Sequence, residues 1–333
     1  MSTDPIVDVR RAIREELDDV DTDALVLVAC SGGPDSLALA LAARLERDRV
    51  GAIVIDHGLQ DGSREVADRT AELLRERGLD PVRVVSVVVV ENGDGMEAAA
   101  RDARYRALFH AAHEVEATVV LLGQTLDDQA ETVLLGLARG SGTRSLAGMP
   151  RRRGMFRRPL LDVPRAVVHA SLPTGIPVVD DAHNHDHRFA RVRVREHVLP
   201  MLERELGPGI VAALARTAQL AREDSEALAE LADELGYDII MGASVHGDLD
   251  VDALQPLATA IRSRIMRTWL IDGSVPAGRL SAEHVKRIDA LVVDWKGQGA
   301  VALPGGVEVV RDCGRLILRP LTDVRSIHLP KEN

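Results

Sequence analysis

The chain has 333 residues, 46% of them hydrophobic and only 2% aromatic, and its formal net charge is −11. This length predicts two domains, and so few aromatic side chains exclude base stacking as the main means of holding a nucleic acid. The acidic balance also disfavours a general nucleic-acid binder. Cys30 and Cys313 form no CxxC pair, which disfavours a thiolate metal site, a redox pair and a secreted disulfide scaffold.

No apolar run reaches the length of a membrane span, and the polar, acidic N-terminus shows no signal-peptide core. We therefore expect a cytoplasmic enzyme with no membrane partner.

Strands and helices alternate along the first 145 residues. Ala24–Ala29 is a continuous apolar run, typical of a strand buried on both faces of a parallel sheet. The pattern predicts strands at 24–29, 52–55, 82–90 and 118–122, with helices at 5–19, 37–45, 63–77 and 96–115 and another from Asp127. This alternation predicts an α/β fold with a doubly wound, mostly parallel sheet.

The pattern changes after about residue 145. Residues 150–200 lack clean periodicity, and the remainder predicts helices at 209–236, 252–271 and 281–293 and a strand pair at 300–303 and 307–319 with Gly305-Gly306 as its turn. We expect a catalytic domain at 1–205, including an Arg-rich segment at 139–200. A second, smaller, mainly helical domain would occupy 206–333.

The loop Ser31-Gly32-Gly33-Pro34-Asp35-Ser36 lies between the first strand and the next helix. Ligands of α/β sheets bind at the carboxyl ends of strands, where glycines let backbone N–H groups approach a phosphate and a helix N-terminus attracts it. The loop has neither the GxxxxGK[ST] nor the GxGxxG pattern. It resembles SGGxDS, the loop of the N-type ATP pyrophosphatases or PP-loop enzymes. The resemblance implies ATP binding and adenylation with release of pyrophosphate; a plain Gly/Pro turn is the alternative.

Asp127 and Asp128 follow the fourth strand and start a helix. Mg²⁺ accompanies ATP and prefers carboxylate and water oxygens, so a carboxylate here could hold the ion and stabilise the leaving pyrophosphate. Acidic residues in a first turn can also serve only as a helix cap. Beside the first loop, the metal role is the better interpretation. Arg101 and Arg104 share one face of the helix at 96–115, as a phosphate contact or as a solvated face.

Taken together in order, several motifs resemble the tRNA(Ile)-lysidine synthase family. The matching segments are SGGPDSLAL (31–39), Asp56-His57-Gly58-Leu59, Glu97–Arg101 with Arg104-Tyr105, DDQAETVLLGLARGSG (127–142), Leu146–Met149, Arg158–Leu161, Asp181 with Asn184 and Asp186, and Phe189–Arg195 running into Leu199-Pro200. The resemblance is strong over 30–200 and weaker through the helices up to the turn at 303–306.

The resemblance implies adenylation of the C2 oxygen of the wobble cytidine in the CAU-anticodon tRNA(Ile). The amine of free L-lysine then displaces AMP, giving lysidine and changing the tRNA from methionine to isoleucine identity. The implied ATP site comprises Ser31, Gly32, Gly33, Pro34, Asp35, Ser36, Asp56, His57 and Gly123. The implied catalytic residues are Asp35, Asp128, Arg101 and Arg104, and Mg²⁺ would lie on Asp35, Asp127 and Asp128. Lysine must attack as a neutral amine; His57 is a candidate base or only a packed side chain.

Two departures from the family pattern stand out. The chain has Gln124 where the family usually has His, and Asp181-Ala182-His183-Asn184 where it usually has Asp-Pro-Ser-Asn. His183, His185 and His187 alternate, but in a polar loop without a companion cysteine this pattern favours a loop over a metal site.

The segment 139–200 has twelve arginines, no lysine and five acidic residues, a local basic footprint inside an acidic protein. Given the resemblance, we expect it to contact tRNA phosphates, a solvated basic loop being the alternative. The arginines expected to bind tRNA are Arg139, Arg151, Arg152, Arg157, Arg158, Arg191, Arg193 and Arg195. The second domain would bind tRNA or substrate at basic spots such as Arg262 and Lys286.

Two other functions compete with a lysidine ligase. One is another PP-loop enzyme, such as a tRNA thiolase or an amidotransferase-type ligase; the chain lacks the paired cysteines of the first and room for the glutaminase domain of the second. The other is a non-catalytic nucleotide- or RNA-binding protein. The sequence leaves the oligomeric state open, with a homodimer as one candidate.

Overall fold

The computed structural model describes residues 4–56, 62–87, 96–140, 143–179, 186–241 and 247–321. The chain divides into two compact units, Met1–Arg222 and Glu223–Asn333. The boundary falls inside α10 (Ile210–Met241), a helix of 32 residues.

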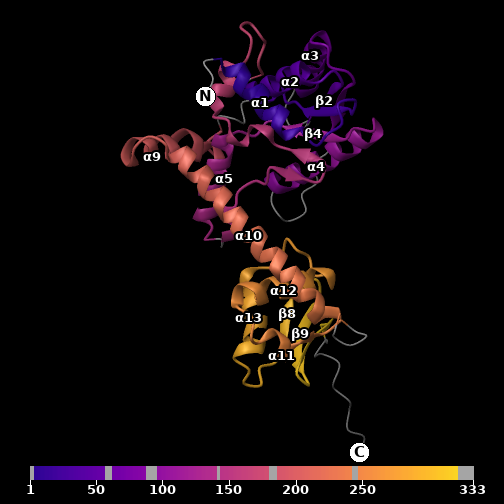
Figure 1. Ribbon diagram of the computed structural model, residues 1–333, viewed down its shortest axis with the longest axis vertical. Coiled ribbons are helices and arrows are strands. Elements are labelled where there is room, and N and C mark those ends of the chain that lie inside the picture. Colours follow the sequence, from indigo (N-terminus) through magenta and orange to yellow (C-terminus); the bar gives the residue numbers. More distant parts are fainter. Residues whose placement is uncertain are drawn as a thin grey trace, which may run out of the picture. The chain divides into compact units, whose positions relative to one another are not determined.

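Unit 1 is built on a six-stranded sheet with the strand order β3-β2-β1-β4-β6-β5. Figure 1 shows β2 and β4 of this sheet among the helices of unit 1. All neighbouring strands are parallel except β5 and β6. The strands are β1 (Val26–Ala29), β2 (Val50–Asp56), β3 (Val82–Ser86), β4 (Val119–Leu122), β5 (Arg152–Arg153) and β6 (Phe156–Arg157). The predicted doubly wound, mostly parallel sheet is confirmed.

Helices cover both faces of this sheet. Successive side chains of its central strand β1 point to opposite faces, and since they are apolar, each face needs helices to bury them. Val26 and Val28 pack into one core with residues of α1, α2 and α3, whereas Leu27 packs into another with Leu108 of α4. The helices before the Arg-rich segment are α1 (Pro5–Glu16), α2 (Pro34–Glu46), α3 (Ser63–Glu76), α4 (Met96–Glu114) and α5 (Leu126–Ala138).

The Arg-rich segment forms only short elements, in keeping with its lack of periodicity. They are α6 (Thr143–Leu146), β5, β6, the 3₁₀ turn η1 (Pro159–Asp162), α7 (Arg165–Ala170), α8 (Ala190–Arg193) and the π-helical turn η3 (Val194–Val198), which leads into α9 (Leu199–Leu206). Among them, α7 packs against α1 and α2. Its first residues therefore lie close to the start of α2, where the PP-loop ends.

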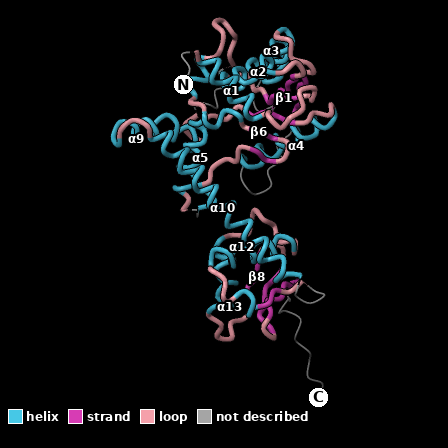
Figure 2. Tube along the Cα trace, in the orientation of Figure 1, coloured by secondary structure: helices cyan, strands magenta, loops and turns pink. Residues whose placement is uncertain are grey.

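Unit 2 combines helices with a four-stranded antiparallel sheet in the order β7-β10-β9-β8 (Figure 2). The strands are β7 (Leu249–Asp250), β8 (Val301–Leu303), β9 (Val307–Asp312) and β10 (Arg315–Pro320); the helices are α11 (Val251–Leu254), α12 (Thr259–Asp272) and α13 (Ala282–Val293). Met266, Ile288 and Leu316 are fully buried in its core. Among the described residues of the whole chain, none of the helices is both long and apolar enough to cross a membrane.

One strand predicted from the sequence is two strands. The segment 307–319 turns back at Cys313 and Gly314, whose φ angles are 45° and 77°, and β9 pairs antiparallel with β10 on either side. Two successive residues with positive φ are typical of a tight hairpin turn. Cysteine rarely adopts positive φ, so the sequence Cys313-Gly314 did not predict a turn within this segment. The second unit is consequently richer in strands than the sequence predicted.

Candidate functional site

The PP-loop follows β1 and is held in shape by its two serines. Oγ of Ser36 accepts a hydrogen bond from the N–H of Ser31 over 3.1 Å and donates to the carbonyl of Gly33 over 3.0 Å. α2 then begins at Pro34, and its N-cap residue Gly33 has no side chain to bond the first-turn N–H groups. Backbone donors and the positive end of the helix dipole are thus directed at the loop, which suits a phosphate.

Gly32 is required by its conformation and by its neighbours. Its φ is +82°, and a Cβ there would lie 2.7 Å from Oγ1 of Thr70 and from Cγ2 of Val179. Val179 also donates its N–H to the carbonyl of Gly32 over 2.9 Å. The segment after α7 therefore packs directly on the loop.

Gly123 allows the carboxyl end of β4 to lie against the loop that follows β1. A Cβ on Gly123 would lie 3.3 Å from the backbone of Asp35 and Ser36. Since only hydrogen fits there comfortably, β4 and α2 approach closely enough for their loops to share one pocket.

That pocket has a volume of about 540 Å³ and lies at the carboxyl ends of β1, β2 and β4. The predicted site residues that line it are Ser31, Gly33, Pro34, Asp35, Ser36, Gly123, Asp128, Arg101, Arg104, Arg191 and Arg195. Arg165, His169 and Glu196 line it as well, although no catalytic or ligand-binding role at this pocket was predicted for them from the sequence.

Three predicted ATP-site residues are not among those that line the pocket: Gly32, which lies within the loop, Asp56 and His57. Asp56 is buried at the end of β2, where its carboxylate accepts hydrogen bonds from the hydroxyls of Ser63 (2.7 Å) and Ser86 (3.3 Å). It does not line the pocket. His57 lies outside the described residues.

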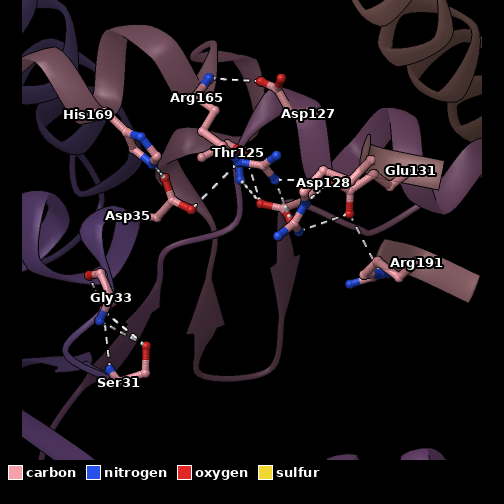
Figure 3. Close-up of polar contacts among 12 residues, drawn as sticks. Ser31, Gly33, Asp35, Thr125, Asp127, Asp128, Glu131, Arg165, His169 and Arg191 are labelled. Atoms are coloured by element: carbon pink, nitrogen blue, oxygen red, sulfur yellow. Dashed lines mark hydrogen bonds and ion pairs between the residues drawn. The ribbon is translucent and has the colours of Figure 1, made fainter. Parts of the chain in front are cut away.

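Asp35 belongs to the PP-loop, and its carboxylate faces His169 and Arg165 (Figure 3). Its Oδ1 lies 3.0 Å from Nε2 of His169, close enough for an ion pair but poorly aligned for a hydrogen bond; among the described residues this buried oxygen has no hydrogen-bond partner. Burial raises the pKa of Asp35, opposed by Arg165 and His169 and reinforced by Asp128. Desolvation thus leaves Asp35 in need of a cation.

Both carboxylate oxygens of Asp128 accept hydrogen bonds (Figure 3). Oδ2 accepts from the N–H and the hydroxyl of Thr125, each over 2.9 Å, which forms the capping box of α5. Oδ1 accepts from Arg165 over 2.9 Å and from Arg195 over 3.3 Å. The cap interpretation is therefore confirmed, whereas the expected role of Asp128 in holding Mg²⁺ stays a prediction.

Asp127 departs from the expectation. Its Oδ2 accepts the N–H of Arg165 over 2.8 Å, and the residue is not among those that line the pocket. In this conformation it positions the start of α7 rather than facing the phosphates.

Arg165 joins the two strand ends. Besides Asp128, its guanidinium contacts Glu131 (3.2 Å) and lies 3.7 Å from Oδ2 of Asp35. Burial acts to lower the pKa of Arg165, but these carboxylates raise it overall. His169 follows four residues later on α7, so both side chains lie on one face of the helix. This i,i+4 spacing was the signal in the sequence that could have identified the pair.

Glu131 is fully buried and accepts from Arg195 over 2.7 Å and from Arg165, while Nε of Arg191 lies 3.8 Å away. A buried carboxylate is stable only when paired. Arg191 and Arg195, which were predicted to bind tRNA, thus form ion pairs with the buried Glu131 beside the pocket.

A second group of arginines surrounds Tyr105 on α4. Arg101 and Arg104 lie over its ring, with 5.3 and 5.7 Å between guanidinium carbon and ring centroid, and Arg158 donates to its hydroxyl over 2.7 Å. Burial lowers the pKa of Arg104, and the neighbouring guanidiniums of Arg101, Arg191 and Arg158 act in the same direction. Packed like charges of this kind favour an anion beside them.

Most of the remaining predicted tRNA arginines have protein partners. Arg157 pairs with Asp19 (2.5 Å), which lowers the pKa of that carboxyl to about 2, and Arg152 pairs with Glu16 (2.7 Å). The other committed side chains are Arg151, paired with Glu16 and Asp162, and Arg193, bonded to the carbonyls of residues 187 and 188. Arg139 is exposed at the end of α5.

Arg158 was also predicted to bind tRNA, but its side chain is buried. It is 1% exposed and donates to the carbonyl of Pro150 and to Tyr105. Enclosed in this way, it stabilises the wall of the pocket and has no surface to offer a phosphate.

The donor set favours Asp35 for a magnesium ion. Its buried oxygen lacks a hydrogen bond, whereas Asp128 would first have to exchange an arginine and Asp127 lies off the pocket. In the described part of the chain, the only group of at least three His, Cys, Asp or Glu side chains with ligand atoms within 4.8 Å of one another is His187, Glu196 and His197. The predicted trio of aspartates is therefore not a preformed metal site.

Two family models match the chain. A PP-loop domain matches residues 5–202, and a TilS substrate binding domain matches residues 249–317. The first covers the sheet and the pocket of unit 1, and the second lies within unit 2.

Curated relatives match over nearly the whole chain. The tRNA(Ile)-lysidine synthase of Thermobifida fusca (strain YX) is 50% identical over 94% of this chain and 97% of its own length. The enzyme of the same name from Streptomyces coelicolor is 48% identical over 90% of this chain and 86% of its own length. Among solved structures, the U34-tRNA thiolase NcsA from Methanococcus maripaludis superposes with a TM-score of 0.54 at 18% identity, over 66% of this chain and 79% of that one. This likeness concerns the fold alone.

Proposed function

The chain belongs to the tRNA(Ile)-lysidine synthase family, and on that premise we propose how its pocket joins L-lysine to the wobble cytidine of the CAU-anticodon tRNA(Ile). The family uses ATP through a PP-loop domain. One observation carries the proposal: the PP-loop and the carboxylate–arginine network after β4 open into the same pocket.

In the first step, the PP-loop backbone and the start of α2 hold the β and γ phosphates of ATP. The C2 oxygen of cytidine attacks the α-phosphorus, the bond to the bridging oxygen breaks, and pyrophosphate leaves. Negative charge then builds on the leaving group, where N–H donors and guanidiniums stabilise it. Arg101 and Arg104 also line the pocket and would hold a second anionic group such as a phosphate of the RNA.

Mg²⁺ would be held by Asp35, whose buried oxygen lacks a hydrogen bond and whose pKa is raised by burial. The ion would neutralise the pyrophosphate oxygens during bond breaking. Asp128 would join it once Arg165 or Arg195 turns to a phosphate.

In the second step, the lysine amine forms a bond to C2 of the adenylated cytidine and AMP leaves with the former C2 oxygen. The amine must lose its proton before it attacks. Asp128 lines the pocket and is already paired with Arg165 and Arg195, so an incoming ammonium group would have to share this carboxylate with them. His57, the base considered from the sequence, stays a candidate outside the described residues.

Binding of the tRNA would combine exposed arginines of unit 1, such as Arg139, with unit 2, whose family model is a substrate binding domain. Phosphate contacts of this kind fix position and carry no sequence information by themselves.

The test is lysine incorporation. Purified protein with ATP and Mg²⁺ should transfer labelled L-lysine to a CAU-anticodon tRNA(Ile) transcript, and Asp35→Asn should lower the rate by about 100-fold or more. A methionine tRNA with the same anticodon is the matched acceptor control. Release of pyrophosphate with tRNA but without entry of lysine would indicate a different PP-loop ligase. No release by folded protein would contradict catalysis altogether.

A further inference from the structure

His187, Glu196 and His197 form a compact group of metal-ligand side chains at the edge of the pocket. Their ligand atoms all lie within 4.8 Å of one another. Nε2 of His187 is 2.6 Å from Oε2 of Glu196, and the rings of His187 and His197 meet edge to face with centroids 4.8 Å apart. Glu196 also lines the pocket, whereas the two histidines do not.

The local backbone explains how consecutive residues converge. Glu196 and His197 both lie in η3, a π-helical turn. π-Helical turns are rare and frequently occur at functional sites. His187 reaches the same place from the preceding loop, before α8 begins at Ala190. Two elements therefore contribute to the group, as expected for a site rather than a chance run of sequence.

The nearby positive charges are already committed, so they do not exclude a cation. Arg188 pairs with Asp186 over 2.6 Å. Arg193 donates to the carbonyls of His187 and Arg188, and Arg195 pairs with Glu131. Because the guanidinium of Arg193 bonds the carbonyl of His187, it also holds this loop against η3.

We propose that His187, Glu196 and His197 bind a transition-metal ion of the Zn²⁺ type. Two imidazoles and a carboxylate are suited to Zn²⁺, Cu²⁺ or Ni²⁺, whereas Mg²⁺ prefers oxygen ligands. Three protein ligands leave a fourth position open for water.

Binding of the ion requires the three ligand atoms to rearrange. Zn–N bonds of about 2.0–2.1 Å place tetrahedral ligand atoms roughly 3.3 Å apart. Nε2 of His187 and Oε2 of Glu196, now 2.6 Å apart, must separate, and any pair near the 4.8 Å limit of the group must approach. His187 has a side chain that is 53% exposed, so rotation about its χ angles can provide this movement. The ion would replace the hydrogen bond between His187 and Glu196, and it would fix the side chain of Glu196 at the rim of the pocket. This site is separate from the magnesium expected on Asp35.

The test is direct binding of Zn²⁺ to the full chain without ATP or tRNA. After removal of metals with a chelator, isothermal titration with ZnCl₂ should show one site per chain that His187→Ala and His197→Ala each weaken by about 10–100-fold or more. MgCl₂ should give no heat at this site. Zn²⁺ should also raise the Tm of the wild type and not that of the variants, since an ion that binds only the folded state stabilises it.

The matched control is His110→Ala combined with His113→Ala, two exposed histidines on α4, which should leave Zn²⁺ binding unchanged. His187→Gln and His197→Gln, checked by circular dichroism, separate loss of a ligand from loss of the fold. The proposal is overturned if the wild type shows no zinc site, or if folded His187 and His197 variants bind Zn²⁺ as tightly as the wild type.

Discussion

The guanidinium of Arg165 donates to Oδ1 of Asp128 over 2.9 Å and thereby joins the start of α7 to the start of α5. Both side chains are largely buried, at 16% and 12% exposure. Because the same guanidinium also approaches Asp35 and Glu131, one arginine balances carboxylates from both strand ends. Four predictions concern this arrangement and the surface around it.

Replacing Arg165 should damage both stability and catalysis. Arg165→Ala leaves buried carboxylates without a partner, which costs about 3–5 kcal/mol when a buried pair is broken; Arg195 remains on Glu131 and should keep the loss near the lower end. Urea unfolding measures the loss, and lysine incorporation should fall with it. Arg188→Ala, which breaks an exposed pair with Asp186, should cost under about 1 kcal/mol. Equal losses in the two variants would contradict the role given to Arg165.

Gly123→Ala should separate the two strand ends. The added methyl would lie 3.3 Å from the backbone of Asp35, so β4 or α2 must shift by a few tenths of an ångström. We expect the free energy of unfolding to fall by about 1–3 kcal/mol from overpacking. Turnover should fall by about 100-fold, because the phosphate-binding loop and the carboxylate–arginine network after β4 would no longer be correctly positioned relative to each other. Gly278→Ala, where nothing lies within 4 Å, is the control. Wild-type turnover in Gly123→Ala would rule out this close approach as a requirement.

Asp35→Asn should raise the stability of the ligand-free protein at neutral pH while abolishing activity. Burial raises the pKa of Asp35 in the folded state. Folding then favours the protonated form, so the wild type loses stability as pH rises from about 4, the unfolded value, through the raised pKa. Asn removes that loss, and the two proteins should converge below about pH 4. Thermal unfolding against pH without ATP or Mg²⁺ measures the difference. Asp48→Asn, at an exposed carboxylate, should barely change Tm at pH 7. A Tm of Asp35→Asn below that of the wild type at pH 7 would reverse the sign.

The arginines expected to hold tRNA should separate into two groups. Arg139→Ala, at an exposed position, should weaken tRNA binding and reduce the salt dependence by about one unit of slope. Arg157→Ala should chiefly lower stability, because its guanidinium pairs with Asp19 and bonds the carbonyl of Glu16. Filter binding across a salt series and urea unfolding give the two readouts. The reverse assignment of effects would show that the pairs with α1 open when tRNA binds.

The sequence predicted those features that depend on local patterns. Apolar runs marked the parallel strands, and SGGxDS marked the turn between β1 and α2, because glycine, proline and a buried strand leave local signatures. The position of Asp128 at a strand end was likewise sufficient to place it in the pocket.

What the sequence could not predict depends on contacts between distant segments. Arg152 meets Glu16 across 136 positions, so its charge seemed free for RNA when only the composition of its own segment was considered. Arg165 and His169 have the i,i+4 spacing of one helix face, but their six-residue helix lies in a segment without clean periodicity, and only its packing against α1 and α2 brings the pair to the pocket. The turn at Cys313 was missed because its positive φ is imposed by pairing of β9 with β10 rather than by residue type.

The capping box formed by Thr125 and Asp128 has a consequence for the coupling between ligands. The carboxylate proposed to meet the substrates also starts α5, so Oδ2 is anchored while Oδ1 alone can change partners. Each arginine that ATP draws away from Oδ1 frees it for a cation, and each cation bound there releases an arginine toward a phosphate. Because of this exchange, the affinity for ATP and the affinity for the cation at Asp128 are thermodynamically coupled, and the coupling is reciprocal. ATP and L-lysine should accordingly tighten each other's binding by the same factor.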